Sequence, residues 1–197
     1  MQPGKVEPGT GFYQQRFTGD AVTPEQGNIT LTKTDEGVSW ASVHWQYLDT
    51  LANVTAHEGK ELKLEKKLFV KRNTDAGKVL EPVTGPLQVG DELVTRLILR
   101  NDRAMEYVHL KDQRGSGTEP TNVLSGYRWQ DGFGYYEMTR DTASHFFIDR
   151  LPAGTHVFET SVRIQHRGDY QTGIAEIRCM YAPEFAAHSA SLLIKVQ

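Results

Sequence analysis

Apolar and polar residues alternate in short runs from Leu62 to the end of the chain, and Gly or Pro closes most of the runs. Alternation places successive side chains on opposite faces, as in a half-buried β-strand. The pattern predicts strands at residues 62–71, 79–80, 93–100, 106–112, 145–149, 156–164, 175–179 and 191–196. About seven regular strands separated by Gly and Pro turns are typical of an antiparallel β-sandwich, so we predict an all-β fold of the immunoglobulin-like kind.

Two details bear on how these strands pack. Residues 62–71 alternate except at Lys66-Lys67, which we interpret as a β-bulge. In the segment 106–112 we expect Tyr107, Val108 and Leu110 to point inward.

A separate β-hairpin is predicted before the sandwich. Residues 29–33 and 38–47 alternate and flank Thr34–Gly37, whose residues suit a tight turn. We therefore divide the chain into an extended segment with a hairpin, residues 1–55, and a sandwich domain, residues 56–197.

Composition and charge exclude several classes of function. A net charge of −3 gives no electrostatic reason to expect a nucleic-acid partner, and no apolar run approaches the roughly 20 residues of a spanning helix. We therefore predict neither nucleic-acid binding nor membrane insertion. The single cysteine, Cys179, cannot form an internal disulfide and lies in a strand-like run, so we expect a small buried hydrophobic side chain.

Candidate chemistry is sparse. The seven histidines are scattered, and none shows the His-x-His spacing that aligns two imidazoles on one strand face. Ser116 lacks the full Gly-x-Ser-x-Gly pattern that exposes a nucleophile on a sharp turn. We therefore predict no enzymatic activity, no metal site and no cofactor.

The segment 114–136 is expected to be irregular and rich in aromatic residues. Tyr127, Trp129 and Tyr135 fall within ten residues and form a candidate partner-binding loop. Such side chains stack on sugar rings or anchor protein interfaces. A long crossover that folds back over the end of the sandwich is the structural alternative.

Residues 62–196 resemble the final macroglobulin-like domain of bacterial alpha-2-macroglobulins, in the form typical of Bacteroidetes. The resemblance rests on several short stretches in a fixed order: Val89–Asp91, Asp102–Asp112, Glu119-Pro120, Leu124–Gly132, Leu151–Gly154, Gly168-Asp169, Met180–Glu184 and His188-Ser189. Residues 10–48 are similar to the strands that leave the thioester-bearing helical domain in such proteins.

This resemblance implies a non-catalytic C-terminal domain of a protease-trapping inhibitor. Family members are large secreted or envelope-bound proteins, so we expect a periplasmic or cell-surface location, neighbouring domains as partners, and a target protease that engages the full-length protein. Met180, Tyr181 and Pro183 match a loop that packs against the thioester region in relatives, so they are the expected interdomain contact. Filling the core of their own sandwich is the alternative role for Met180 and Tyr181. The alternative function is a carbohydrate- or cell-surface-binding module that uses residues 127–136.

Overall fold

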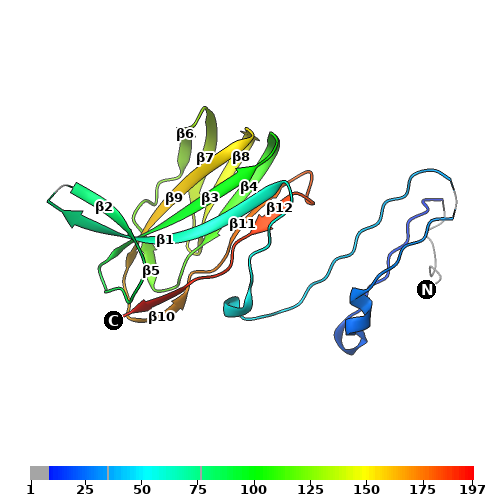
Figure 1. Ribbon diagram of the computed structural model, residues 1–197, viewed down its shortest axis with the longest axis horizontal. Coiled ribbons are helices and arrows are strands. Elements are labelled where there is room, and N and C mark those ends of the chain that lie inside the picture. Colours follow the sequence, from blue (N-terminus) through cyan, green and yellow to red (C-terminus); the bar gives the residue numbers. More distant parts are fainter. Residues whose placement is uncertain (1–8, 35, 76) are drawn as a thin grey trace. The chain divides into compact units, whose positions relative to one another are not determined.

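The computed structural model describes residues 9–34, 36–75 and 77–197 (Figure 1). The chain divides into two compact units, Met1–Gln46 and Tyr47–Gln197. The boundary between the two units thus falls at residues 46–47. The boundary between domains that the sequence places after residue 55 stays a prediction.

The first unit contains no β-strand among its described residues. Two short 3₁₀ helices, η1 (Gly19–Ala21) and η2 (Pro24–Gly27), interrupt an otherwise extended chain. The predicted hairpin is therefore wrong for the described residues, and Asp35 of its turn lies outside them. The physical reason is that Ile29, Trp40 and Trp45 are exposed and have no apolar layer to pack on, without which a two-stranded hairpin is at best marginal.

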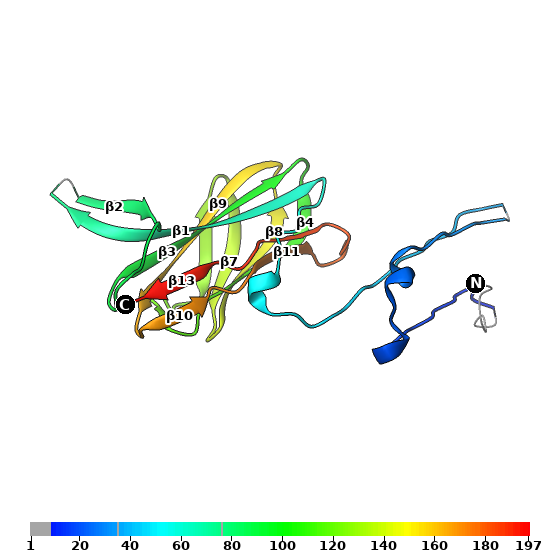
Figure 2. The same cartoon turned by 60° about the horizontal axis from the view of Figure 1, so that its bottom comes forward.

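The second unit is a β-sandwich, as predicted. One sheet has five strands in the order β2 (Gly77–Pro82), β1 (Leu62–Thr74), β3 (Glu92–Asn101), β9 (Gly154–Ile164) and β5 (Thr118–Pro120). The other has six, in the order β12 (Ala186–His188), β11 (Ala175–Cys179), β4 (Met105–Gln113), β8 (Ala143–Leu151), β7 (Phe133–Thr139) and β6 (Gly126–Gln130). Strand β10 (Gly168–Gln171) pairs with β13 (Leu193–Val196), as Figure 2 shows, and a short helix η3 (Leu51–Asn53) precedes the sandwich.

Two hydrophobic clusters hold the sandwich together. The larger one lies between the two large sheets and includes Leu64, Leu97, Leu110, Phe146 and Phe158. The smaller one lies toward β13 and includes Val70, Leu93, Ile164 and Ile194. Because both clusters draw side chains from strands far apart in sequence, the burial of apolar surface ties the whole unit together.

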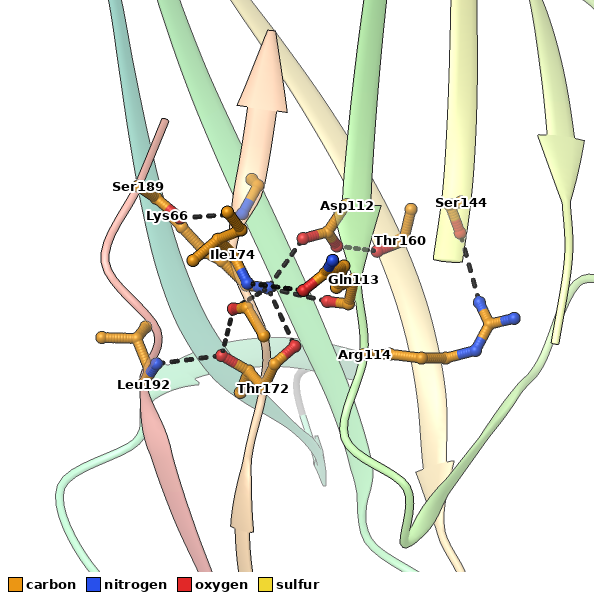
Figure 3. A network of polar contacts seen from close by, with 12 residues as sticks. Lys66, Asp112, Gln113, Arg114, Ser144, Thr160, Thr172, Ile174, Ser189 and Leu192 are labelled. Atoms are coloured by element: carbon orange, nitrogen blue, oxygen red, sulfur yellow. Dashed lines mark hydrogen bonds and ion pairs between the residues drawn. The ribbon is translucent and has the colours of Figure 1, made fainter. Parts of the chain in front are cut away.

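A buried ion pair separates the two clusters along β1. The register between β1 and β3 is continuous, so the predicted bulge at Lys66-Lys67 is absent and Lys66 points inward. Its ammonium lies 2.7 Å from Asp112 Oδ1, and both side chains are almost wholly buried (Figure 3). The backbone carbonyls of Gln113 and Gly173 accept further hydrogen bonds at 2.9 and 3.2 Å. Burial raises the pKa of Asp112, and the Lys66 ammonium opposes that rise.

Strand β4 changes phase near its start. Met105 and Val108 are both buried although they are three residues apart, and between them Tyr107 adopts a left-handed backbone with φ +52°. Tyr107 is therefore exposed, not inward as predicted, whereas Val108 and Leu110 are buried as predicted.

Strands β6 and β7 form a tight hairpin inside the segment predicted to be irregular. Gln130 pairs with Phe133 across the two-residue loop Asp131-Gly132, and both loop residues have positive φ. An Asp-Gly loop with this backbone matches the right-handed twist of the flanking strands.

Candidate functional site

The loop Met180–Glu184, here called the Tyr181 loop, connects β11 to β12 and has a well-anchored backbone. The amide of Cys179 donates to the carbonyl of Phe185 at 3.0 Å, and the amide of Phe185 donates to the carbonyl of Ala182 at 3.0 Å. The amide of Met180 donates to the carbonyl of Tyr107 on β4 at 2.9 Å. Phe185 also packs against the main core, so the loop is fixed at both ends.

Three apolar side chains of this loop nevertheless face solvent. Met180 is 58% exposed, Tyr181 is 82% exposed and Pro183 is exposed. The Tyr107 ring, 51% exposed, meets the Tyr181 ring edge-on with centroids 5.1 Å apart. The structure therefore adds Tyr107 to the residues proposed from the sequence. Only its left-handed backbone brings it there, and the sequence carries no signal of that conformation.

The aromatic side chains of the β6–β7 hairpin divide between the two faces of the sheet. Tyr127 and Trp129 are exposed, and Tyr127 contacts Tyr136 edge-on with centroids 5.1 Å apart. Tyr135 instead packs on Phe146 and Phe158 of the core, and its hydroxyl donates to Gln130 Oε1 at 3.1 Å. Burial raises the pKa of Tyr135. The structure thus brings Tyr127 and Trp129 together and separates Tyr135 from them.

A glycine supports the exposed tryptophan. A β-carbon built at Gly134 would lie 3.3 Å from three adjacent atoms of the Trp129 ring. The ring therefore passes closely over the backbone of β7 on one side, while 80% of the residue is open to solvent.

Two histidines that are distant in sequence meet on the outer face of the same sheet. His109 Nε2 and His145 Nδ1 are 3.0 Å apart, so one ring donates a hydrogen bond to the other. The Phe147 ring stacks on His109 with centroids 4.7 Å apart. Burial is the main cause that lowers the pKa of both histidines, and the positive charges of nearby groups, including Lys111, lower them further. No spacing rule links residues 36 positions apart, so the sequence could not predict this pair.

The described residues form no grouping suited to metal binding. Within residues 9–34, 36–75 and 77–197, no three His, Cys, Asp or Glu side chains are grouped closely enough to hold a metal ion. Cys179 is buried as predicted, and burial raises the pKa of its thiol, which disfavours the reactive thiolate. No helix in these ranges has the length and apolar character needed to cross a membrane.

Comparison with known proteins decides the family. Residues 62–184 match the model of the bacterial alpha-2-macroglobulin MG10 domain. The chain belongs to this family. No curated protein matches it.

Solved structures agree with the MG10 fold. Native alpha-2-macroglobulin of Escherichia coli, spanning domain MG7 to the C-terminus, has 16% identity and a TM-score of 0.58 over 74% of this chain and 25% of that chain. The E. coli protein activated by porcine elastase has 17% identity and a TM-score of 0.59 over 73% of this chain and 14% of that one. Salmonella alpha-2-macroglobulin reacted with methylamine has 17% identity and a TM-score of 0.57 over 73% of this chain and 10% of that chain. The chain therefore spans a small part of each of these proteins.

The extent of the MG10 match agrees with the structural elements. The match begins at Leu62, the first residue of β1, and ends at Glu184, the last residue of the Tyr181 loop. The β6–β7 hairpin and the Tyr181 loop both lie inside it, whereas the first unit lies outside.

Apart from these surfaces, described residues of the β1–β2 hairpin, the start of β3 and β9 line a hollow of about 410 Å³. Two ion pairs neutralise much of its charge: Lys71 with Glu92 at 2.8 Å and Arg72 with Asp91 at 2.7 Å.

Proposed function

We propose that this chain is the non-catalytic C-terminal domain of an alpha-2-macroglobulin-like protease-trapping inhibitor. In this proposal the Tyr181 loop packs against a neighbouring domain and holds the uncleaved conformation. The observation that carries the proposal is an anchored loop backbone that presents Met180 and Tyr181 to solvent.

The chemistry of the loop favours a protein contact. Exposed apolar side chains that adjoin one another mark interaction sites more often than isolated ones do. A thioether and an amphipathic aromatic ring can seal an apolar contact, and an anchored backbone loses little further entropy on docking. The exposure of Met180 and Tyr181 speaks against the alternative role of filling their own core.

The rest of the assignment follows from the family. We infer a periplasmic or cell-surface location, and a target protease that is engaged by the full-length protein. The comparison structures include an Escherichia coli protein activated by trypsin, and that description belongs to that protein alone. For this chain, protease trapping is a proposal.

We further propose that residues 1–55 belong to the region that follows the thioester domain. Val38, Trp40 and Tyr47 are largely exposed in this chain. Contacts with domains of the parent protein would bury such side chains and favour the extended conformation that the sequence pattern predicts.

Two substitutions in the full-length parent test the docking proposal. Met180→Ala and Tyr181→Ala should each accelerate the rearrangement that follows protease cleavage, or trigger it without cleavage, as measured by native-gel mobility and, if a thioester is present, by its reactivity. Tyr127→Ala is the matched control, because it removes another exposed tyrosine, on β6 and outside the Tyr181 loop. Wild-type behaviour of both loop variants would refute the docking role.

Carbohydrate binding by Tyr127 and Trp129 is a second candidate function. The supporting observation is that the Trp129 ring lies against the Gly134 backbone and leaves its other side open. An open aromatic face can stack on a pyranose ring, and Tyr127 on the same strand face extends that platform. Tyr135 has no part in it because it packs into the core.

Tryptophan fluorescence tests this candidate directly. The chain has three tryptophans, so Trp40→Phe and Trp45→Phe together leave Trp129 as the sole indole reporter. Quenching or a spectral shift on titration with a glycan, lost in Trp129→Ala, would support sugar binding. A glycan array without signal, together with unchanged fluorescence, would exclude it.

A further inference from the structure

Tyr107 has a backbone conformation that needs an explanation. Among the described residues, Tyr107 (φ +52°) and Asp131 (φ +48°) are the two non-glycine residues with positive φ. Asp131 lies in the tight turn of the β6–β7 hairpin, where positive φ is required. Tyr107 lies inside a strand, where a bulky residue rarely adopts this conformation, and such backbone strain often marks a functional constraint.

The conformation gives Tyr107 two contacts with the Tyr181 loop. Its carbonyl accepts the Met180 amide at 2.9 Å, and its ring meets the Tyr181 ring at a 90° interplanar angle. These contacts reach the first two residues of the loop. The backbone contact fixes where the loop begins, and the ring contact limits where the Tyr181 side chain can go.

We propose that Tyr107 is a positioning residue that orients Tyr181 for docking. This inference rests on the proposed function, and it adds a residue on another strand to the docking surface. Tyr107 and Tyr181 then present a joint surface to the neighbouring domain, in which the Tyr107 ring contacts the Tyr181 ring from the side and limits its movement.

The competing explanation is purely structural. The left-handed residue also lets both Met105 and Val108 enter the core. Tyr107→Gly separates the two explanations, because glycine adopts positive φ freely and keeps the phase change while it removes the ring. Tyr107→Phe keeps the ring and removes only the hydroxyl, so it is the conservative control.

The first experiment uses this chain alone. The order of the Tyr181 ring is measured by NMR relaxation, and the melting temperature is measured in parallel. We expect Tyr107→Gly to fold without loss of melting temperature but to lower the population of the oriented Tyr181 ring about 2- to 10-fold, the range for one edge-to-face aromatic pair. Tyr107→Phe should match the wild type. An equally ordered Tyr181 ring in Tyr107→Gly, or equal disorder in Tyr107→Phe, would overturn the proposal.

The second experiment places Tyr107→Gly and Tyr181→Ala in the full-length parent. We expect both variants to accelerate the protease-triggered rearrangement, and Tyr107→Phe to leave it unchanged. An effect of Tyr181→Ala without any effect of Tyr107→Gly would overturn the positioning role and leave docking intact. If neither variant has an effect, the docking function fails, and the NMR result on this chain decides whether Tyr107 orients the ring.

Discussion

Residues 38–47 and strand β1 share an alternating pattern, but only β1 forms a strand. Both alternate apolar and polar side chains. Strand β1 pairs with β2 on one side and β3 on the other, and its inward residues Leu62 and Leu64 are buried. In residues 38–47 no strand forms, and Trp40 is 93% exposed. Alternation therefore selects which residues can share a face, but a strand also needs a neighbouring ladder and a second layer to pack on.

The largest expected effect comes from the charge that β1 buries. Lys66→Met should destabilise the sandwich by about 3–5 kcal/mol, because Asp112 is left as an unpaired buried charge. Urea unfolding measures the change.

The double variant Lys66→Met with Asp112→Leu controls for this interpretation. It should recover most of the lost free energy of unfolding, since apolar side chains replace buried ion pairs at little cost. A double variant as unstable as the single one would show that packing at Lys66, not charge, sets the loss.

Truncation of an inward residue on β1 should have the next largest effect. Leu64→Ala removes apolar contacts inside the main cluster and should cost about 2–5 kcal/mol of unfolding free energy, measured by the same urea titration. A cost below about 1 kcal/mol would mean that the two sheets are not packed through this residue.

The histidine pair predicts a smaller, pH-dependent effect on the sandwich. Folding lowers the pKa of His109 and His145, so the unfolded state binds more protons once the pH falls through the unfolded value of about 6.5. Stability should therefore be full above that pH and should decline below it. Thermal melts between pH 8 and pH 5 measure the decline.

A variant with both imidazoles removed, His109→Phe with His145→Gln, is the control for this effect. It should lose less melting temperature over the same pH range than the wild type. An identical decline in both proteins would assign the pH dependence to other groups.

The smallest effect is expected in residues 38–47. Trp40→Ser should change the free energy of unfolding of this chain by no more than about 0.5 kcal/mol, because the side chain is exposed. The same substitution in the parent protein should lower its melting temperature if neighbouring domains cover Trp40. An equal response in both settings would argue against that covering.

The sequence predicted the strands of the sandwich best where alternation, turns and a buried face coincide. The strand predicted at residues 175–179 matches β11, and those predicted at 93–100 and 156–164 match β3 and β9 to within about two residues. The prediction failed at Lys66, because a charged residue in an inward position indicates a bulge unless its partner on another strand is known. Asp112 is 46 positions away, so only the fold identifies it.

Two further features show what local patterns miss or leave unresolved. The Asp131-Gly132 pair is a strong hairpin signal that the aromatic and glycine content of its surroundings concealed. Met180 and Tyr181 are exposed, and their interdomain contact stays a prediction from family resemblance. The ring contact between Tyr107 and Tyr181 accompanies a backbone conformation that no spacing of residue types encodes.

Side-chain footprinting of Tyr181 tests the docking account most directly. Hydroxyl-radical labelling would be compared between this chain and the uncleaved full-length parent, with Tyr127 as an internal reference. The account predicts strong labelling of Tyr181 in this chain, where it is 82% exposed, and marked protection in the uncleaved parent. Equal labelling of Tyr181 in both proteins would contradict it.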